Sequence, residues 1–360
     1  MEMYENQGVV PLKLENLEKI RRNGMKNVHV PNFDPNEVSI GMLHIGVGGF
    51  HRAHQAYYTQ KVIEEDFESS KHWGICGIGL LDSDEVIQSK LKSQDFLYSI
   101  LQPSSNDTND EYKLTIIASL KNMLLLTKDS EREQILKLAL SPEIRIISLT
   151  ITEKGYLMDI PSQILIDSHP VIQHDLQNPQ NPKSALGFLS FVIESRRIQQ
   201  LSGLTLISCD NIPLNGHVLK AGIKAFGRLV YGDQFIEYIE SHCSFPSTMV
   251  DGITPIAEQF HVDLIANRFE ILDQAVTVCE EWQQWCIEDV KFACGRPNWD
   301  TIQNGYAAQV VTNVADYENT KICLLNVPHS ALAYGGGWML GKETMDEAMR
   351  DENVIRLFKI

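Results

Sequence analysis

The stretch MLHIGVGGFHRAH, residues 42–54, decides how the rest of the chain is read. Met42–Val47 is a short apolar run that ends in glycines, and Ala53–Glu65 behind it has apolar residues at helical spacing. The stretch therefore predicts a strand, a glycine-rich turn and a helix in succession.

The same alternation recurs along the chain. Trp73–Leu80 predicts a second strand and Asp84–Leu91 its helix. Successive units of this kind imply parallel strands joined by crossover helices. From about Thr301 onward the strand signals stop and the pattern is helical. The remaining strand and helix candidates are Lys113–Ser119, Glu131–Leu140, Arg145–Ile151, Ala185–Gln199 and Leu204–Ser208.

This pattern predicts an α/β fold, with a Rossmann-type, doubly wound and mainly parallel sheet followed by an α-helical C-terminal domain. We expect an N-terminal arm at 1–40, a dinucleotide-binding domain at 41–300 and the start of a helical domain at 301–360.

The glycines after the first strand indicate a nucleotide. In a dinucleotide fold the first glycine allows the tight turn and the second lets the backbone approach the pyrophosphate. Gly46 and Gly48 fit these roles, while His51 replaces the third glycine. The alternative is a glycine-rich strand end in an unrelated sheet. The residues expected to bind the cofactor are Gly46, Gly48, Gly49, Phe50, His51 and Arg52.

Two carboxylates, Asp82 and Asp84, follow the second strand. An acid at this place binds the adenosine ribose hydroxyls and repels a 2′-phosphate, so it favours NAD over NADP. The alternative is helix capping by Asp82 or Ser83.

His51 and His54, three residues apart, invite a metal hypothesis. No Asp, Glu or Cys cluster completes such a site at recognisable spacing, so we expect no metal and histidines that make hydrogen bonds. A metal-dependent hydrolase built on these two histidines is the remote alternative.

Asn211 follows the strand at Leu204–Ser208, where open α/β sheets place their ligands. Its amide could hydrogen-bond a substrate oxygen that gains charge. Spacing alone favours the alternative, an Asx turn.

Lys321, Asn326 and His329 stand in an otherwise apolar segment that Pro328 interrupts. Apolar neighbours would desolvate the lysine and lower its pKa toward that of a general base. The alternative, which spacing favours, is a snorkelling lysine on an amphipathic helix.

Composition excludes several classes of protein. With 31 Lys+Arg against 47 Asp+Glu the net charge is −16, which argues against a nucleic-acid binder. We find no apolar run of membrane-spanning length and no signal-peptide pattern. Seven dispersed cysteines suggest buried free thiols, and together these features predict a cytoplasmic protein.

Taken together, several segments resemble the mannitol dehydrogenase family of polyol-specific long-chain dehydrogenases, in the family's order over about residues 40–335. The resemblance implies a Rossmann-type domain and a helical domain with substrate held between them. The matching stretches are HIGVGGFHRAHQAYYT at 44–59, WGICGIGL at 73–80, SPEIRIISLTITEKGY at 141–156, SCDNIPLNG at 208–216, MVDGITP at 249–255 and KICLLNVPHSALAY at 321–334.

The resemblance also implies residue roles. Lys321 is the general base, Asn211 and Asn326 hydrogen-bond the reacting oxygen, and His329 and Asp251 line the polyol site. The activity implied is metal-independent hydride transfer between a polyol and NAD, D-mannitol giving D-fructose, with arabinitol or sorbitol left open as substrates. The acid that selects NAD falls on Asp84, with Asp82 as the near alternative. A monomer is slightly favoured.

Three departures from the family pattern stand out. Gly252 replaces the usual arginine after Asp251, Val327-Pro328 replaces a glycine-containing pair before His329, and family members continue well beyond Ile360. We therefore expect a truncated helical domain with exposed apolar surface. The competing hypothesis is a non-catalytic nucleotide-binding remnant.

Overall fold

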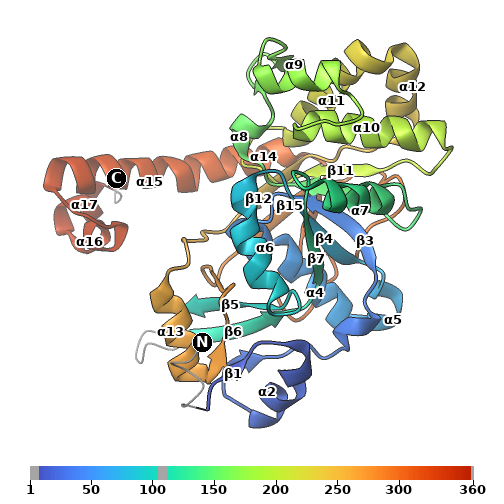
Figure 1. Cartoon of the computed structure of the whole chain (residues 1–360). Helices are drawn as coiled ribbons and strands as arrows, with labels where there is room; N and C mark the ends of the chain where they lie inside the picture. Colours follow the sequence, from blue (N-terminus) through green and yellow to red (C-terminus); the bar gives the residue numbers. More distant parts are fainter. Residues whose placement is uncertain (1–7, 104–111, 358–360) are drawn as a thin grey trace. The chain divides into compact units, whose positions relative to one another are not determined.

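The computed structural model describes residues 8–103 and 112–357, which form two compact units, Met1–Val311 and Thr312–Ile360. The centre of the first unit is a five-stranded parallel sheet (Figure 1). Its strands, in the order β11-β8-β3-β4-β7, are β3 (Ile40–Ile45), β4 (Gly74–Gly79), β7 (Leu120–Leu125), β8 (Ile146–Leu149) and β11 (Thr205–Ser208).

This strand order confirms the Rossmann-type prediction. Counted along the chain, the five strands lie in the spatial order 3-2-1-4-5, and the two halves diverge between β3 and β8. That divergence is the topological switch point, where the loops after neighbouring strands leave a crevice.

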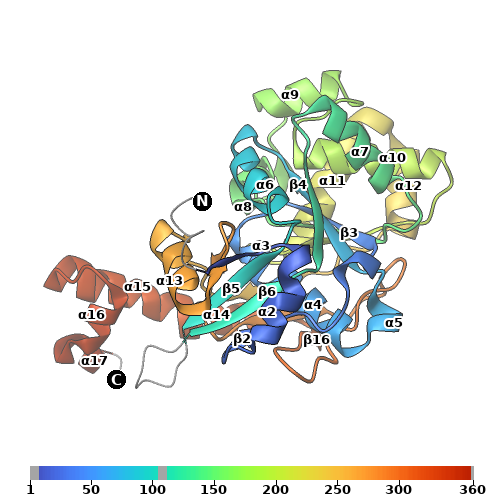
Figure 2. The same cartoon turned by 60° about the horizontal axis from the view of Figure 1, so that its bottom comes forward.

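Both faces of the sheet are buried, as a parallel sheet requires. Leu43 and Ile45 of β3 pack in one apolar cluster with α7 (Asp129–Ala139), α10 (Ala185–Ile198) and α11 (Asn215–Tyr231). Met42, one residue before Leu43 and so on the opposite face, packs in a second cluster with α4 (Gln55–Glu65). Figures 1 and 2 show α10 and α11 on the side of the sheet away from α4.

The third strand of the parallel sheet was not the one predicted. The stretch Lys113–Ser119 overlaps β6 (Tyr112–Ile117), which pairs antiparallel with β5 (Tyr98–Pro103) in a separate sheet of order β14-β5-β6-β2. The chain crosses between the sheets in two residues and enters β7 at Leu120. The apolar run at 114–126 hides this crossing because both strands are buried.

Residues 8–39 have more structure than an arm. β1 (Val10–Pro11) pairs with β13 (Ile271–Leu272), and β2 (Val28–His29) pairs with β6. Between them, α2 (Leu17–Asn23) buries its apolar residues in a third cluster. The domain bounds 1–40, 41–300 and 301–360 stay a prediction.

The remaining elements of the first unit surround these sheets. A three-stranded sheet has the order β12-β15-β16, and β16 lies beyond Thr301. The bounds are α3 (Gly49–Ala53), α5 (Phe67–Ser70), α6 (Glu85–Lys92), α8 (Thr152–Gly155), β9 (Met158–Asp159), β10 (Ile164–Leu165), α9 (Pro170–Gln177), α12 (Asp233–His242), β12 (Thr248–Asp251), α13 (Gln259–Phe269), β14 (Thr277–Val278), β15 (Gln284–Glu288) and β16 (Gln309–Val311).

The second unit begins with a helical run over residues 314–339. It passes from α14 (Val314–Lys321) through a π-helical turn, Ile322–Asn326, into α15 (Val327–Leu332). Pro328 lies in the first turn of α15, so its missing N–H falls where the bonding pattern changes, and the chain stays helical. A second π-helical segment, α16 (Met345–Arg350) and α17 (Glu352–Leu357) follow.

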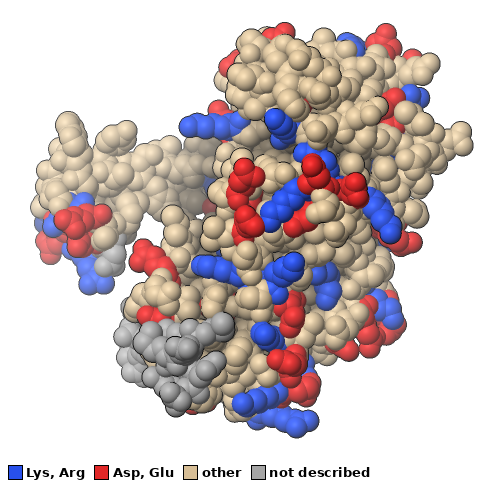
Figure 3. All heavy atoms as spheres, viewed as in Figure 1, with Lys and Arg blue, Asp and Glu red and all other residues tan. Residues whose placement is uncertain are grey.

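Three general features complete the fold. None of the helices in the described ranges is long and apolar enough to cross a membrane. All seven cysteines are free, and Cys323 is exposed rather than buried as expected. On the face drawn in Figure 3, Lys and Arg side chains lie interspersed with Asp and Glu.

Candidate active site

The turn after β3 has a geometry that only glycine fits. Gly46 has φ +94°, and a Cβ on it would lie 2.1 Å from the carbonyl oxygen of Thr150. By contrast, a Cβ on Gly48 or Gly49 would meet nothing within 4 Å. The turn is therefore tight against the sheet at Gly46 and open at the next two glycines, as a backbone that receives a pyrophosphate must be.

This geometry predicts that an added methyl group destabilises the fold at Gly46 but not at Gly49. Gly46→Ala should lower the free energy of unfolding by about 2–4 kcal/mol, since it combines backbone strain with a collision. Gly49→Ala, the matched control, lies in α3 with open space around it and should be neutral or slightly stabilising. Urea unfolding of the two variants measures the difference. Equal stability of both would contradict the assigned turn.

A buried polar network joins this turn to β8 across the switch point. The His44 ring contacts Ser148 Oγ through Nδ1 at 2.8 Å and Thr150 Oγ1 through Nε2 at 2.9 Å. Ser148 Oγ donates to Gln55 Oε1 at 2.7 Å, and Thr150 Oγ1 donates to the Gly46 carbonyl at 2.7 Å. Burial lowers the pKa of His44 to about 3, so the ring is neutral. Sequence reasoning missed this network, although polar residues inside apolar strands were its signal.

His51, predicted to bind cofactor, lies inside the domain. Its ring stacks on His44 with centroids 3.4 Å apart, and it is buried. Burial, reinforced by neighbouring His44 and Arg52, holds the pKa of His51 well below its ordinary value. The geometry gives His51 a packing role beneath the turn.

Arg52 and His54 also point inward. The Arg52 guanidinium, expected to face phosphate, is buried over the Tyr98 ring and donates to the Ala275 carbonyl. These partners offset part of the cost of burying the charge, and the buried Arg52 Nε has no hydrogen-bond partner among the described residues. His54 Nε2 contacts the Gln284 carbonyl at 3.1 Å. In the described ranges no group of three or more His, Cys, Asp or Glu side chains is placed to hold a metal.

The two candidate ribose ligands have different environments. Asp84 Oδ2 accepts the Leu81 N–H at 3.0 Å, and its side chain packs over Gly79, so Asp84 carries the capping role. Asp82 is exposed at the start of the same 3-10 turn.

The loop after β11 is anchored on both sides of Asn211. Asp210 is buried and accepts the Thr152 N–H at 2.8 Å and the Tyr156 hydroxyl at 2.8 Å. Burial raises the pKa of Asp210, against the opposing effect of these bonds. Asn215 Nδ2 donates to the Asp210 carbonyl at 3.0 Å. Asn211 itself is exposed within this anchored loop.

Asn215 also connects this loop to β12, the strand that carries Asp251. The Asn215 amide donates to the Thr248 carbonyl at 2.9 Å and accepts the Thr248 N–H at 2.8 Å. Asp251 ends β12, is buried, and accepts the Gly252 N–H at 2.9 Å. Gly252 has φ +147°, a conformation that suits glycine in place of the family's arginine. Sequence reasoning missed Asp210, Tyr156 and Asn215 as positioning residues.

A cavity of about 300 Å³ opens beside the glycine turn. Gly49, Phe50 and Arg52 line it from the turn and α3, Ile87 and Lys90 from α6, and residues 254–259 from the loop before α13. It lies where the sequence predicts the cofactor.

The other predicted catalytic residues belong to the second unit. Lys321 ends α14, Asn326 ends the π-helical turn and His329 lies in α15. Ile322 and Leu324 are 41% and 74% exposed, so they do not surround Lys321 as expected. Convergence of these residues with Asn211 and Asp251 stays a prediction.

Comparisons with known proteins give consistent matches. A family model described as "Mannitol dehydrogenase Rossmann domain" matches residues 40–301. D-mannonate oxidoreductase of Escherichia coli K12 is 38% identical over 320 residues, 89% of this chain. Mannitol 2-dehydrogenase of Pyricularia oryzae is 36% identical over 330 residues, 90% of this chain. The chain spans 63% of the length of each of these relatives.

Solved structures show the same likeness. Pseudomonas fluorescens mannitol 2-dehydrogenase, in a ternary complex with NAD and D-mannitol, matches with a TM-score of 0.87 at 35% identity. The match covers 97% of this chain and 68% of that one. A substrate-free D-sorbitol dehydrogenase matches with a TM-score of 0.83 at 30% identity.

Proposed function

The chain belongs to the mannitol dehydrogenase family, and from this membership we propose that it is an NAD-dependent oxidoreductase acting on a secondary alcohol of a polyol. The observation that carries the proposal is the turn after β3, closed at Gly46 and open at Gly48 and Gly49, at the switch point of a Rossmann-type sheet. NAD, when bound, supplies the hydride acceptor.

The residues present fit this cofactor. The open backbone at Gly48 and Gly49 leaves room for the pyrophosphate, and Phe50 lines the adjoining cavity. Asp82 or Asp84, at the end of β4, would hold the adenosine ribose. Arg52 lines the same cavity, and the buried His51 would support the turn from inside the domain.

The remaining chemistry falls to side chains of both units. The Lys321 Nζ takes the proton of the alcohol, and the amides of Asn211 and Asn326 donate hydrogen bonds to the oxygen as it gains charge. Asp251 and His329 bind the substrate's other hydroxyl groups. No step requires a metal, so activity should persist in the presence of a chelator.

We propose D-mannitol, oxidised to D-fructose, as the substrate. The E. coli relative is named for mannonate, which carries a carboxylate. Here position 252 is glycine and the adjacent Asp251 is a buried carboxylate, an arrangement that favours a neutral polyol over an acid. Initial rates of NAD reduction with D-mannitol, D-sorbitol, D-arabinitol and D-mannonate test this, and a preference for mannonate would overturn it.

Cofactor choice gives a separate prediction. A carboxylate at Asp82 or Asp84 repels the 2′-phosphate of NADP, so the wild type should bind NAD more tightly than NADP. Replacing both residues with alanine should reduce the ratio of NAD affinity to NADP affinity by about tenfold or more, because a charged hydrogen bond to the ribose is lost. Calorimetric affinities for both cofactors check this. Equal affinities in the wild type would remove the carboxylates from the cofactor site.

A further inference from the structure

A larger cavity, of about 630 Å³, lies at the opposite end of α4 from the glycine turn. α4 begins at Gln55, behind the turn, and Lys61, Val62, Glu64 and Glu65 near its end line the cavity. At 1.5 Å per residue the helix separates the two places by roughly 9–15 Å. The cavity is therefore distinct from the proposed crevice.

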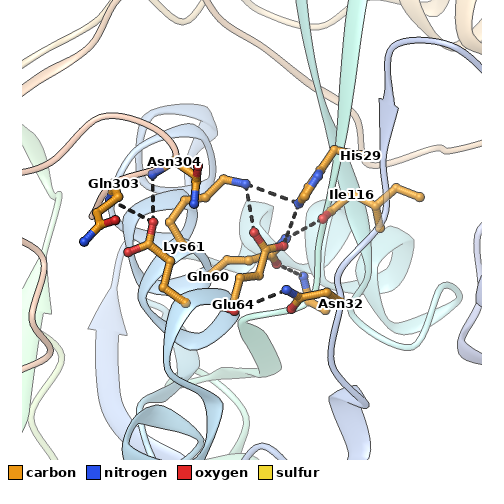
Figure 4. Close-up of polar contacts among 10 residues, drawn as sticks. His29, Asn32, Gln60, Lys61, Glu64, Ile116, Gln303 and Asn304 are labelled. Carbon is orange, nitrogen blue, oxygen red and sulfur yellow. Dashed lines mark hydrogen bonds and ion pairs between the residues drawn. The ribbon is translucent and has the colours of Figure 1, made fainter. Parts of the chain in front are cut away.

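A buried ion cluster forms one wall of this cavity (Figure 4). Lys61 Nζ donates to Glu64 Oε2 at 2.8 Å and lies 3.2 Å from His29 Nε2. The carboxylate of Glu64 also contacts His29 at 2.7 Å and Gln60 at 3.1 Å. The side chains of Lys61 and Glu64 are only 9% and 6% exposed.

This cluster favours the charged form of Glu64. Burial alone would raise the pKa of Glu64, but the bonds from His29 and Lys61 outweigh it and hold the pKa below its ordinary value. The Lys61 ammonium has three N–H donors, and its bond to Glu64 occupies one of them, while His29 Nε2, which donates to Glu64, cannot also accept from Lys61. An acceptor in the cavity would complete its bonding, which matters for so deeply buried a charge.

The opposite wall is a loop held in place by Glu65. Its Oε1 accepts the backbone N–H groups of Gln303 and Asn304 at 2.8 and 2.7 Å. The side-chain amides of this loop, together with Asn32 and Asn298, line the cavity. Amides offer both donors and acceptors, so this wall suits hydroxyl groups, which do the same.

The charges of the lining narrow the ligand class. An anion would meet the carboxylates of Glu64, Glu65 and Asp66, and a cation would meet Lys61. A neutral ligand rich in hydroxyl groups can use the lysine, the amides and the carboxylates together. The cavity volume also lies within the usual range for small-molecule sites. We propose that this cavity is a second binding site, for a neutral polyhydroxylated molecule such as a sugar or a sugar alcohol, with Lys61 donating to one of its hydroxyl oxygens.

Binding to the full chain without NAD tests the proposal independently of any turnover. D-Mannitol and D-glucose are the neutral probes, inorganic phosphate the anionic probe and putrescine the cationic probe, followed by NMR of the side-chain amides of Asn32, Asn298, Gln303 and Asn304. We expect a saturable response to at least one neutral probe and none to the charged probes. Saturation by phosphate or putrescine, or no response to either neutral probe at millimolar concentrations, would overturn the proposal.

Two variants locate the binding. Lys61→Met should weaken it about tenfold or more, because a charged hydrogen bond is lost. Lys137→Met, which removes the same charge from an exposed position of α7, should leave it unchanged. Asn304→Leu changes an exposed loop side chain and should weaken binding without affecting folding, so it serves even if Lys61→Met is unstable. Neutral-probe affinity unchanged in Asn304→Leu and in a folded Lys61→Met would place the ligand elsewhere.

Discussion

Replacing Lys321 by alanine is expected to lower the rate of polyol oxidation by about 10²–10⁴-fold, the usual contribution of a general base. NAD affinity should stay as in the wild type, because Lys321 is assigned to the substrate alcohol. Steady-state kinetics and calorimetry of the variant measure the two quantities. Lys342→Ala is the control, since Lys342 pairs with Asp351 in the same unit and has no assigned role in catalysis.

If Lys321 is the general base, the rates of polyol oxidation and ketose reduction should depend on pH in opposite directions. A general base must be unprotonated to accept the hydroxyl proton, so the rate of polyol oxidation should rise with pH. Ketose reduction should fall over the same range, because the protonated lysine is then the acid. In Lys321→Ala both dependences should disappear, and a small primary amine should restore part of the rate. A snorkelling lysine would lose only packing on replacement, worth up to about 1 kcal/mol, with the pH profile unchanged.

Replacing Asn211 by alanine is expected to lower kcat by about 10²–10³-fold, as for loss of one donor to a developing oxyanion. Asp210 and Asn215 anchor the loop through bonds that do not involve the Asn211 side chain, so the fold should survive. The exposed Asn178→Ala at the end of α9 is the control and should retain full activity. Loss of NAD affinity with unchanged kcat would make Asn211 a structural turn residue.

The sequence was sufficient to predict a Rossmann-type fold, since most of its βα units appear as a short apolar run followed by a helical pattern. It failed at the third strand, because β6 and β7 form one apolar run and only the three-dimensional pairing separates them. Amphipathic patterning carries no information about which sheet a buried strand joins.

The residues of the candidate site were likewise predicted only in part. Gly46 was predictable because its turn needs a glycine. Arg52 lines the cavity beside this turn, but its contacts with Ala275 and Tyr98 could not be predicted because they come from distant segments. The anchors Asp210 and Asn215 were missed since their partners lie in distant segments. The covering of Lys321 by Ile322 and Leu324 was overestimated, because both side chains are exposed and sequence neighbours on a helix need not cover one another.

Isotope transfer tests the central claim, that the chain moves a hydride from a polyol carbinol to NAD. Wild-type protein would be incubated with NAD and D-mannitol carrying deuterium at its secondary carbinol carbon C2, and the reduced cofactor analysed by mass spectrometry. We expect reduced NAD that carries one deuterium from each turnover at the labelled carbon, with D-fructose as the other product. NAD that binds but acquires no deuterium would contradict it and leave the chain a nucleotide-binding remnant without polyol chemistry.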